Sequence, residues 1–139
     1  MSLNNQLSQY QENQMKTTTP GKLLLMAFDA AIRFINVATE KMKEGKLDEQ
    51  GANITKAQNI ILELMSSLDM DKDRELANAL YNLYSYIFDR LTHASIRDDL
   101  QAMEEVVGIL SEMRATWAEA EHLVRTGRHT AVGMERIAA

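Results

Sequence analysis

The chain has 139 residues, a formal net charge of −5 and a pI near 5.2, and 45% of its residues are hydrophobic while 25% are charged. This length fits one globular domain with a single core. The amino-acid composition is that of a globular protein and differs strongly from that of a disordered chain. The acidic balance and the scattered Lys and Arg residues exclude the clustered basic surface that binds nucleic acid. Without cysteine, the chain has neither a disulfide framework nor a thiolate metal site.

The sequence shows no sign of a membrane span or of a secretory signal. No stretch approaches the roughly 20 uninterrupted apolar residues of a transmembrane helix, and the first residues lack the basic-then-apolar order of a signal peptide. We therefore expect a cytosolic protein without membrane insertion. Six Gly and one Pro leave few turn residues, which favours helices throughout.

Residues 1–18 are rich in Asn and Gln and have no sustained hydrophobic period, so we interpret them as a mobile N-terminal segment. A first helix is predicted from Pro20, because Thr19 can cap free N–H groups and proline has no N–H to lose in the first turn. Apolar residues then recur at helical spacing as far as Met42, and Gly45 suits the left-handed position that ends a helix.

Two further apolar periods follow. One runs from Ile54 to Leu68 and ends in the acidic turn 69–73, whose carboxylates suit the N-terminus of the next helix. The other runs over residues 76–94 and is broken near Ser95, where residues 95–98 fit a capping box for the helix that comes after.

The fourth apolar period runs from Leu100 to Val124, and Gly127 is expected to close that helix. Trp117 lies on the same stripe and is expected to close one end of the core. Four amphipathic segments joined by short links predict an all-α fold, an antiparallel up-down four-helix bundle. The predicted divisions are the mobile segment 1–18, the bundle 19–126 and a flexible C-terminal tail 127–139.

The predicted helices carry more apolar residues than a bundle core requires. At about 100° per residue, ten large side chains lie at or beyond the edges of the core stripes. Four of them are Met26, Ile32, Val37 and Tyr86. The other six are the candidate contacts: Leu25, Ile60, Leu62, Tyr81, Tyr84 and Phe88. Contiguous apolar surface usually faces a partner, and a groove between amphipathic helices suits another helix. The alternative is that the bundle twists enough to bury these residues at the edge of its core.

Two patterns resemble metal sites without being complete. Glu119 and His122 have the Glu-x-x-His spacing of helical di-iron proteins, but a working site needs a second such pair. The acidic turn 69–73 mimics the start of a calcium loop in which Arg74 replaces the required glycine. We find no phosphate-binding glycine loop and no nucleophile with a persuasive base. The sequence therefore predicts no metal, no cofactor and no enzymatic activity.

Five segments in chain order carry a family resemblance. They are Tyr10 with residues 18–23, residues 26–35, residues 56–61 with 63–64 and 67–69, residues 83–86 with Arg90 and Leu91, and Met113 with Arg114 and Trp117. Their order and spacing resemble the FliS-type flagellin-specific export chaperones. Phe28 and Ala30 stand where that family usually has tyrosine and glycine.

The resemblance implies a helical bundle that holds the disordered C-terminal region of flagellin, prevents premature polymerisation in the cytosol and keeps the subunit competent for type III export. Components of the flagellar export gate are further candidate partners. With Tyr10 of the N-terminal segment, the six candidate contacts form the expected client-binding set, and residues 1–16 are expected to act as a movable cover. The rival hypothesis is a structural or regulatory bundle that uses the same flanks to form a homodimer.

Overall fold

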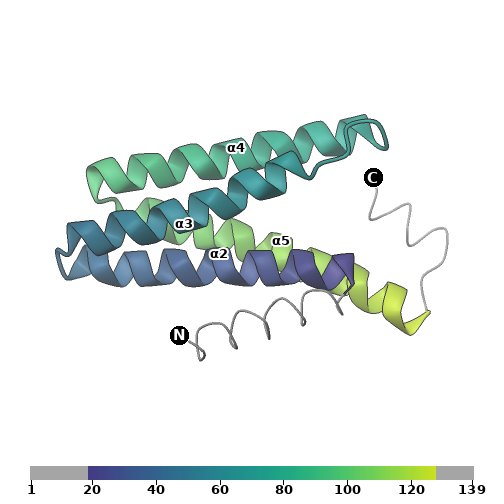
Figure 1. Ribbon diagram of the computed structural model, residues 1–139, viewed down its shortest axis with the longest axis horizontal. Coiled ribbons are helices and arrows are strands. Elements are labelled where there is room, and N and C mark those ends of the chain that lie inside the picture. The colour runs from purple at the N-terminus through teal and green to yellow at the C-terminus, as the bar shows by residue number, and fades with distance from the viewer. Residues whose placement is uncertain (1–18, 128–139) are drawn as a thin grey trace, which may run out of the picture.

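The computed structural model describes residues 19–127 as four α-helices: α2 (Pro20–Lys43), α3 (Leu47–Ser66), α4 (Arg74–Arg97) and α5 (Leu100–Thr126). Each helix packs against its neighbours in the chain, and α2 also packs against α5, so the four close into a ring (Figure 1). The prediction of an all-α, antiparallel, up-down four-helix bundle is confirmed. The predictions of a mobile segment at 1–18 and a flexible tail at 127–139 lie outside the described residues, apart from Gly127, which is the C-cap of α5.

Several helix ends lie where the sequence places them. The Thr19 hydroxyl accepts a hydrogen bond from the Lys22 N–H at 3.2 Å, and Pro20 opens α2. Gly45 follows that helix with a φ of 73°, which is the left-handed conformation expected of it. In the acidic turn, the Asp73 carboxylate accepts from the Leu76 N–H at 3.1 Å and caps α4.

The capping box predicted at residues 95–98 is wrong. Ser95 is the third residue from the end of α4, and the helix ends only when Asp98 adopts left-handed backbone angles of φ 52° and ψ 46°. Aspartate is among the few non-glycine residues that tolerate this conformation. The next residue, Asp99, then caps α5 by accepting from the Ala102 N–H at 3.1 Å.

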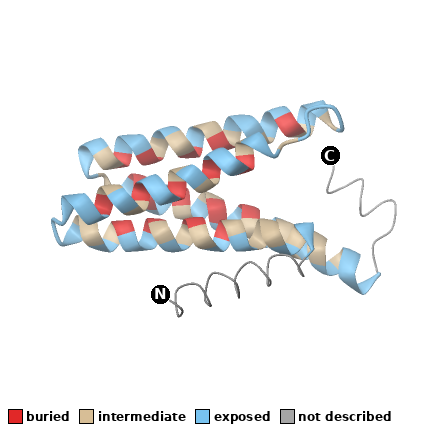
Figure 2. Ribbon diagram, in the orientation of Figure 1, coloured by how far each residue is buried: buried red, intermediate tan, exposed pale blue. Residues whose placement is uncertain are grey.

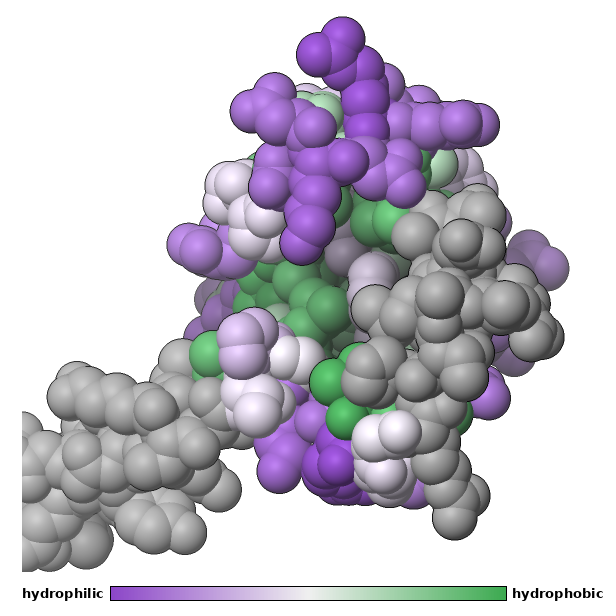
Figure 3. Space-filling view, turned by 90° about the vertical axis from the view of Figure 1, so that its right-hand side faces the viewer, coloured by the Kyte–Doolittle hydropathy of each residue, from purple (hydrophilic) through white to green (hydrophobic). Residues whose placement is uncertain are grey.

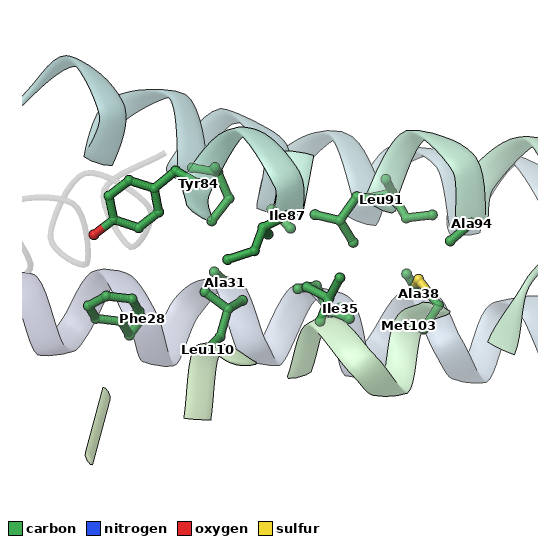
Figure 4. Close-up of a cluster of buried hydrophobic side chains, with 14 of the residues drawn as sticks. Phe28, Ala31, Ile35, Ala38, Tyr84, Ile87, Leu91, Ala94, Met103 and Leu110 are labelled. Carbon is green, nitrogen blue, oxygen red and sulfur yellow. The ribbon is translucent and has the colours of Figure 1, made fainter. Parts of the chain in front are cut away.

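One core runs along the bundle, and all four helices contribute buried residues to it (Figure 2). Phe28 of α2 and Tyr84 of α4 lie opposite one another near the end where α2 begins, and Leu110 of α5 completes the next layer (Figure 4). Trp117 packs against the same core but remains partly exposed. It therefore covers the end of the core without being enclosed by it.

Polar side chains fix neighbouring helices to one another. The Gln58 amide of α3 donates to the Phe88 carbonyl of α4 at 3.1 Å and to the Thr92 hydroxyl at 2.8 Å. Arg114 of α5 donates from Nε to Asp29 of α2 at 2.7 Å and from a terminal nitrogen at 3.2 Å. Both links use residues from the segments that carry the family resemblance, so part of that pattern sets helix register. Among the four described helices, none has the length and apolar character needed to cross a membrane.

Candidate client-binding surface

Three of the predicted contact residues lie together on the outer side of α3 and α4. Gln58 faces α4, and Leu62 follows it by one turn on the same side of α3. Tyr81 and Phe88 are seven residues apart, so they share one side of α4. We call Leu62, Tyr81 and Phe88 the α3–α4 seam.

The seam is a track about two helical turns long. The Gln58 bond to Phe88 sets the antiparallel register, and Leu62 then lies about 6 Å from that level toward the α3–α4 turn. Tyr81 lies about 10 Å from Phe88 in the same direction, at 1.5 Å per residue. Leu62 is 46% exposed and Tyr81 is 43% exposed, whereas Phe88 is partly buried against the core. The seam thus offers two accessible apolar side chains beside a third that is anchored.

Two other predicted residues lie elsewhere on the ring. Lys56, one turn before Ile60, holds its ammonium 5.5 Å from the centre of the Phe34 ring of α2, so Ile60 lies on the α2 side of α3. Leu25 lies one turn before Asp29, which pairs with α5, and therefore lies on the α5 side of α2. Both side chains are partly buried. They do not join the seam.

The expectation that Tyr84 lies at the edge of the core is wrong. Its side chain is 2% exposed and packs in the central cluster, because α4 turns this position inward together with Ile87 and Leu91. Burial raises the pKa of the Tyr84 phenol to about 12. A residue in this position supports the fold, and a client could reach its ring only if the bundle opened. Tyr10, the remaining predicted contact, lies outside the described residues.

Tyr86 has the same exposed fraction as Tyr81, 43%, but faces α5. Its hydroxyl donates to the Glu105 carboxylate at 2.6 Å, and Arg90 donates to the other oxygen at 2.8 Å. These two donors hold the pKa of Glu105 below its usual value. Tyr86 therefore belongs to a polar link between α4 and α5, on the opposite flank from the seam.

A second apolar feature, which the sequence did not predict, lies between the start of α2 and the end of α5. This pocket of about 430 Å³, which we call the end pocket, has walls that are mostly apolar. Its lining residues are Thr19, Pro20, Gly21, Lys22, Leu24, Trp117, Ala120, Glu121, Val124 and Arg125. Apolar side chains also line the hollow seen when this end of the bundle faces the viewer (Figure 3).

The end pocket arises because α5 extends past the other helices, as its last turns show in Figure 1. Val124 was assigned to the core stripe by its spacing, yet its side chain is 53% exposed. The sequence therefore indicated the end pocket only through the apolar period of α5, which continues further along that helix than the neighbouring helices can cover.

Residues 19–127 contain no group of three or more His, Asp or Glu side chains placed to hold a metal ion. Nδ1 of His122 lies 3.1 Å from a guanidinium nitrogen of Arg125 one turn later on α5. The Glu-x-x-His pattern thus stands on a helix end beside a cation.

Comparison with known proteins identifies the family. The family described as "Flagellar protein FliS" matches residues 3–124. "Flagellar secretion chaperone FliS" of Bacillus subtilis (strain 168) is 32% identical over 134 residues, covering 96% of this chain and 99% of that protein. The protein of the same description from Salmonella typhimurium is 36% identical over 109 residues, covering 78% and 81% of the two chains.

A solved structure described as "Crystal structure of flagellar chaperone from bacteria" has the same fold. It superposes with a TM-score of 0.71 at 19% identity and covers 85% of this chain and 96% of that one. The family match spans nearly the whole of the bundle and includes the segments that link α2 to α5 and α3 to α4. The chain belongs to the FliS family of flagellar proteins.

Proposed function

We propose that this protein is a flagellar secretion chaperone that binds the disordered C-terminal region of flagellin, with the α3–α4 seam as the main contact. Two observations support the proposal: relatives that cover most of the chain are named as flagellar secretion chaperones, and the seam leaves two large apolar side chains exposed. The assignment of the α3–α4 seam as the binding surface rests on the exposure of Leu62 and Tyr81 on one outer face.

The seam suits a client that folds as it binds. A segment that becomes ordered loses chain entropy, so it must bury a long apolar strip to bind stably. An amphipathic client helix can lay its apolar face along two packed helices, with side chains one and two turns apart as anchors. Tyr81 fits this role because its ring buries apolar area while its hydroxyl stays in water or bonds to the client backbone.

Covering the apolar face of the flagellin segment would prevent that face from pairing with other subunits. The chaperone would act in the cytosol and release its client to the export gate, which is the second partner we propose. The proposed activity is binding and involves no chemical step.

The proposal is tested by titrating the full chain with a synthetic flagellin C-terminal peptide, followed by calorimetry and by light scattering. We expect saturable binding and a mass increase of one peptide per chain. A chain that is dimeric by light scattering and shows no heat with the peptide would support the rival, a self-associating bundle, and would overturn the chaperone proposal.

A further inference from the structure

The end pocket has no part in the proposed function, because it is built by α2 and α5 while the seam lies on α3 and α4. Its volume of about 430 Å³ is in the range of roughly 300 to 1,000 Å³ typical of pockets that hold a ligand. Val124 and Trp117 give it apolar walls that remain partly exposed to water. Exposed apolar walls in a hollow of this size favour an apolar occupant.

We propose that the occupant is a segment of the same chain, residues 128–139, which carries Val132, Met134 and Ile137. Gly127, the residue before this segment, lies two positions after Arg125 of the pocket lining. Gly127 ends α5 with a φ of 69°, and its N–H donates to the Leu123 and Val124 carbonyls. A left-handed residue at this position ends the helix and turns the chain away from the helix axis, so under this proposal the residues that follow have the pocket within reach.

The segment is long enough to cover the pocket. Val124 and Trp117 are seven helical residues apart, which corresponds to about 10 Å along α5. An extended chain covers that distance with three or four residues at about 3.3 Å each. Residues 128–130 can make the turn, which leaves Val132 and Met134 to lie over the walls.

The side chains of the segment match the pocket. Val132 and Met134 are two residues apart, so in an extended chain they point to the same side. Methionine adapts its shape to irregular apolar gaps. The next two residues, Glu135 and Arg136, carry opposite charges, and the lining of the end pocket also includes both signs, from Lys22 and Glu121 among others.

The test uses Trp117, the single tryptophan of the chain, whose side chain lines the pocket. In the full chain, Met134→Asp should displace the segment, because a carboxylate does not enter an apolar pocket unpaired. We expect Trp117 emission at longer wavelength and stronger quenching by acrylamide. His129→Asp adds the same charge in the proposed connector and should leave both readings at the parent values. Circular dichroism should show equal helix content in all three proteins.

The proposal is independent of flagellin binding, and the remaining outcomes decide against it. It is wrong if Met134→Asp leaves Trp117 unchanged, or if His129→Asp changes Trp117 equally. If deletion of residues 1–16 exposes Trp117 and Met134→Asp does not, the N-terminal segment is the occupant. If Trp117 becomes protected only when flagellin peptide is added, the pocket belongs to the client.

Discussion

The buried side chain of Tyr84 is expected to affect both the stability of the bundle and its response to alkaline pH. Its ring lies opposite Phe28 in the core, and its hydroxyl points toward the end of the bundle where α2 begins (Figure 4). The residue was predicted at the edge of the stripe because α4 carries apolar side chains on more than half of its circumference. Spacing alone did not show which of these α3 and α5 would cover.

Truncation of this side chain should destabilise the bundle. We expect Tyr84→Ala to lower the free energy of unfolding by about 3 to 5 kcal/mol, the range for removing a buried aromatic ring, as measured by urea denaturation. Tyr84→Phe keeps the ring and should cost far less. Under conditions in which Tyr84→Phe is fully folded, it should bind flagellin peptide as the parent does. An alanine variant as stable as the parent would show that the ring is not in the core.

The same residue should give the protein a distinct sensitivity to alkali. Burial raises the pKa of Tyr84 from 10.0 to about 12, so the unfolded chain loses this proton first as the pH rises. The folded state is therefore destabilised relative to the unfolded state between about pH 10 and 12. Urea titrations across that range should show a steeper loss of stability for the parent than for Tyr84→Phe. Parallel pH profiles would contradict this assignment.

At the scale of the helices, the sequence predicts most of the ends and misses those that depend on one backbone conformation. Thr19, Gly45 and Asp73 act as their residue types predict. The turn between α4 and α5 depends instead on the left-handed backbone conformation of Asp98. The sequence does not reveal this conformation, because Ser95 is an equally plausible cap residue.

The two aspartate caps should contribute separately to stability. Asp73→Ala and Asp99→Ala each remove a carboxylate that accepts from a first-turn N–H, which typically costs about 1 kcal/mol. The caps lie at opposite ends of α4, so their effects should add in the double variant. Asp71→Ala, in the same acidic turn as Asp73 but exposed, is the control and should be near neutral in urea denaturation. Equal losses for Asp71→Ala and Asp73→Ala would mean that general charge, and not capping, is responsible.

The N-terminal segment remains a prediction at the same scale. Deleting residues 1–16 should raise the affinity or the association rate for flagellin peptide with little loss of stability, if the segment covers part of the track. Stopped-flow binding and thermal denaturation of the deletion variant measure the two effects. Unfolding of the bundle would make the segment structural, whereas lost binding in a folded bundle would make Tyr10 a contact.

At the scale of the whole molecule, apolar periodicity predicts four helices and their antiparallel order. It cannot show which neighbouring helix each flank of a helix faces. Each helix has two neighbours, and the polar links decide which flank faces which one. Gln58 places Leu62 and Phe88 beside the α3–α4 interface, while Asp29 and Arg114 place Leu25 toward α5. These links join residues 30 and 85 positions apart, so no local pattern contains them. The six candidate contacts therefore separate into the seam, the core and two other interfaces.

The central claim is that flagellin binds along the α3–α4 seam, and a matched pair of tyrosines tests it most directly. Tyr81 and Tyr86 lie on the same helix with the same exposed fraction of 43%, one on the seam and one facing α5. In calorimetric titrations with a flagellin C-terminal peptide, Tyr81→Ala should weaken the binding free energy by roughly 1 to 3 kcal/mol, as expected for loss of an aromatic anchor. The binding free energy of Tyr86→Ala should stay near that of the parent. Unfolding should occur at similar urea concentrations in both variants. Equal affinities for the two variants, or a loss confined to Tyr86→Ala, would contradict the claim and place the client elsewhere on the bundle.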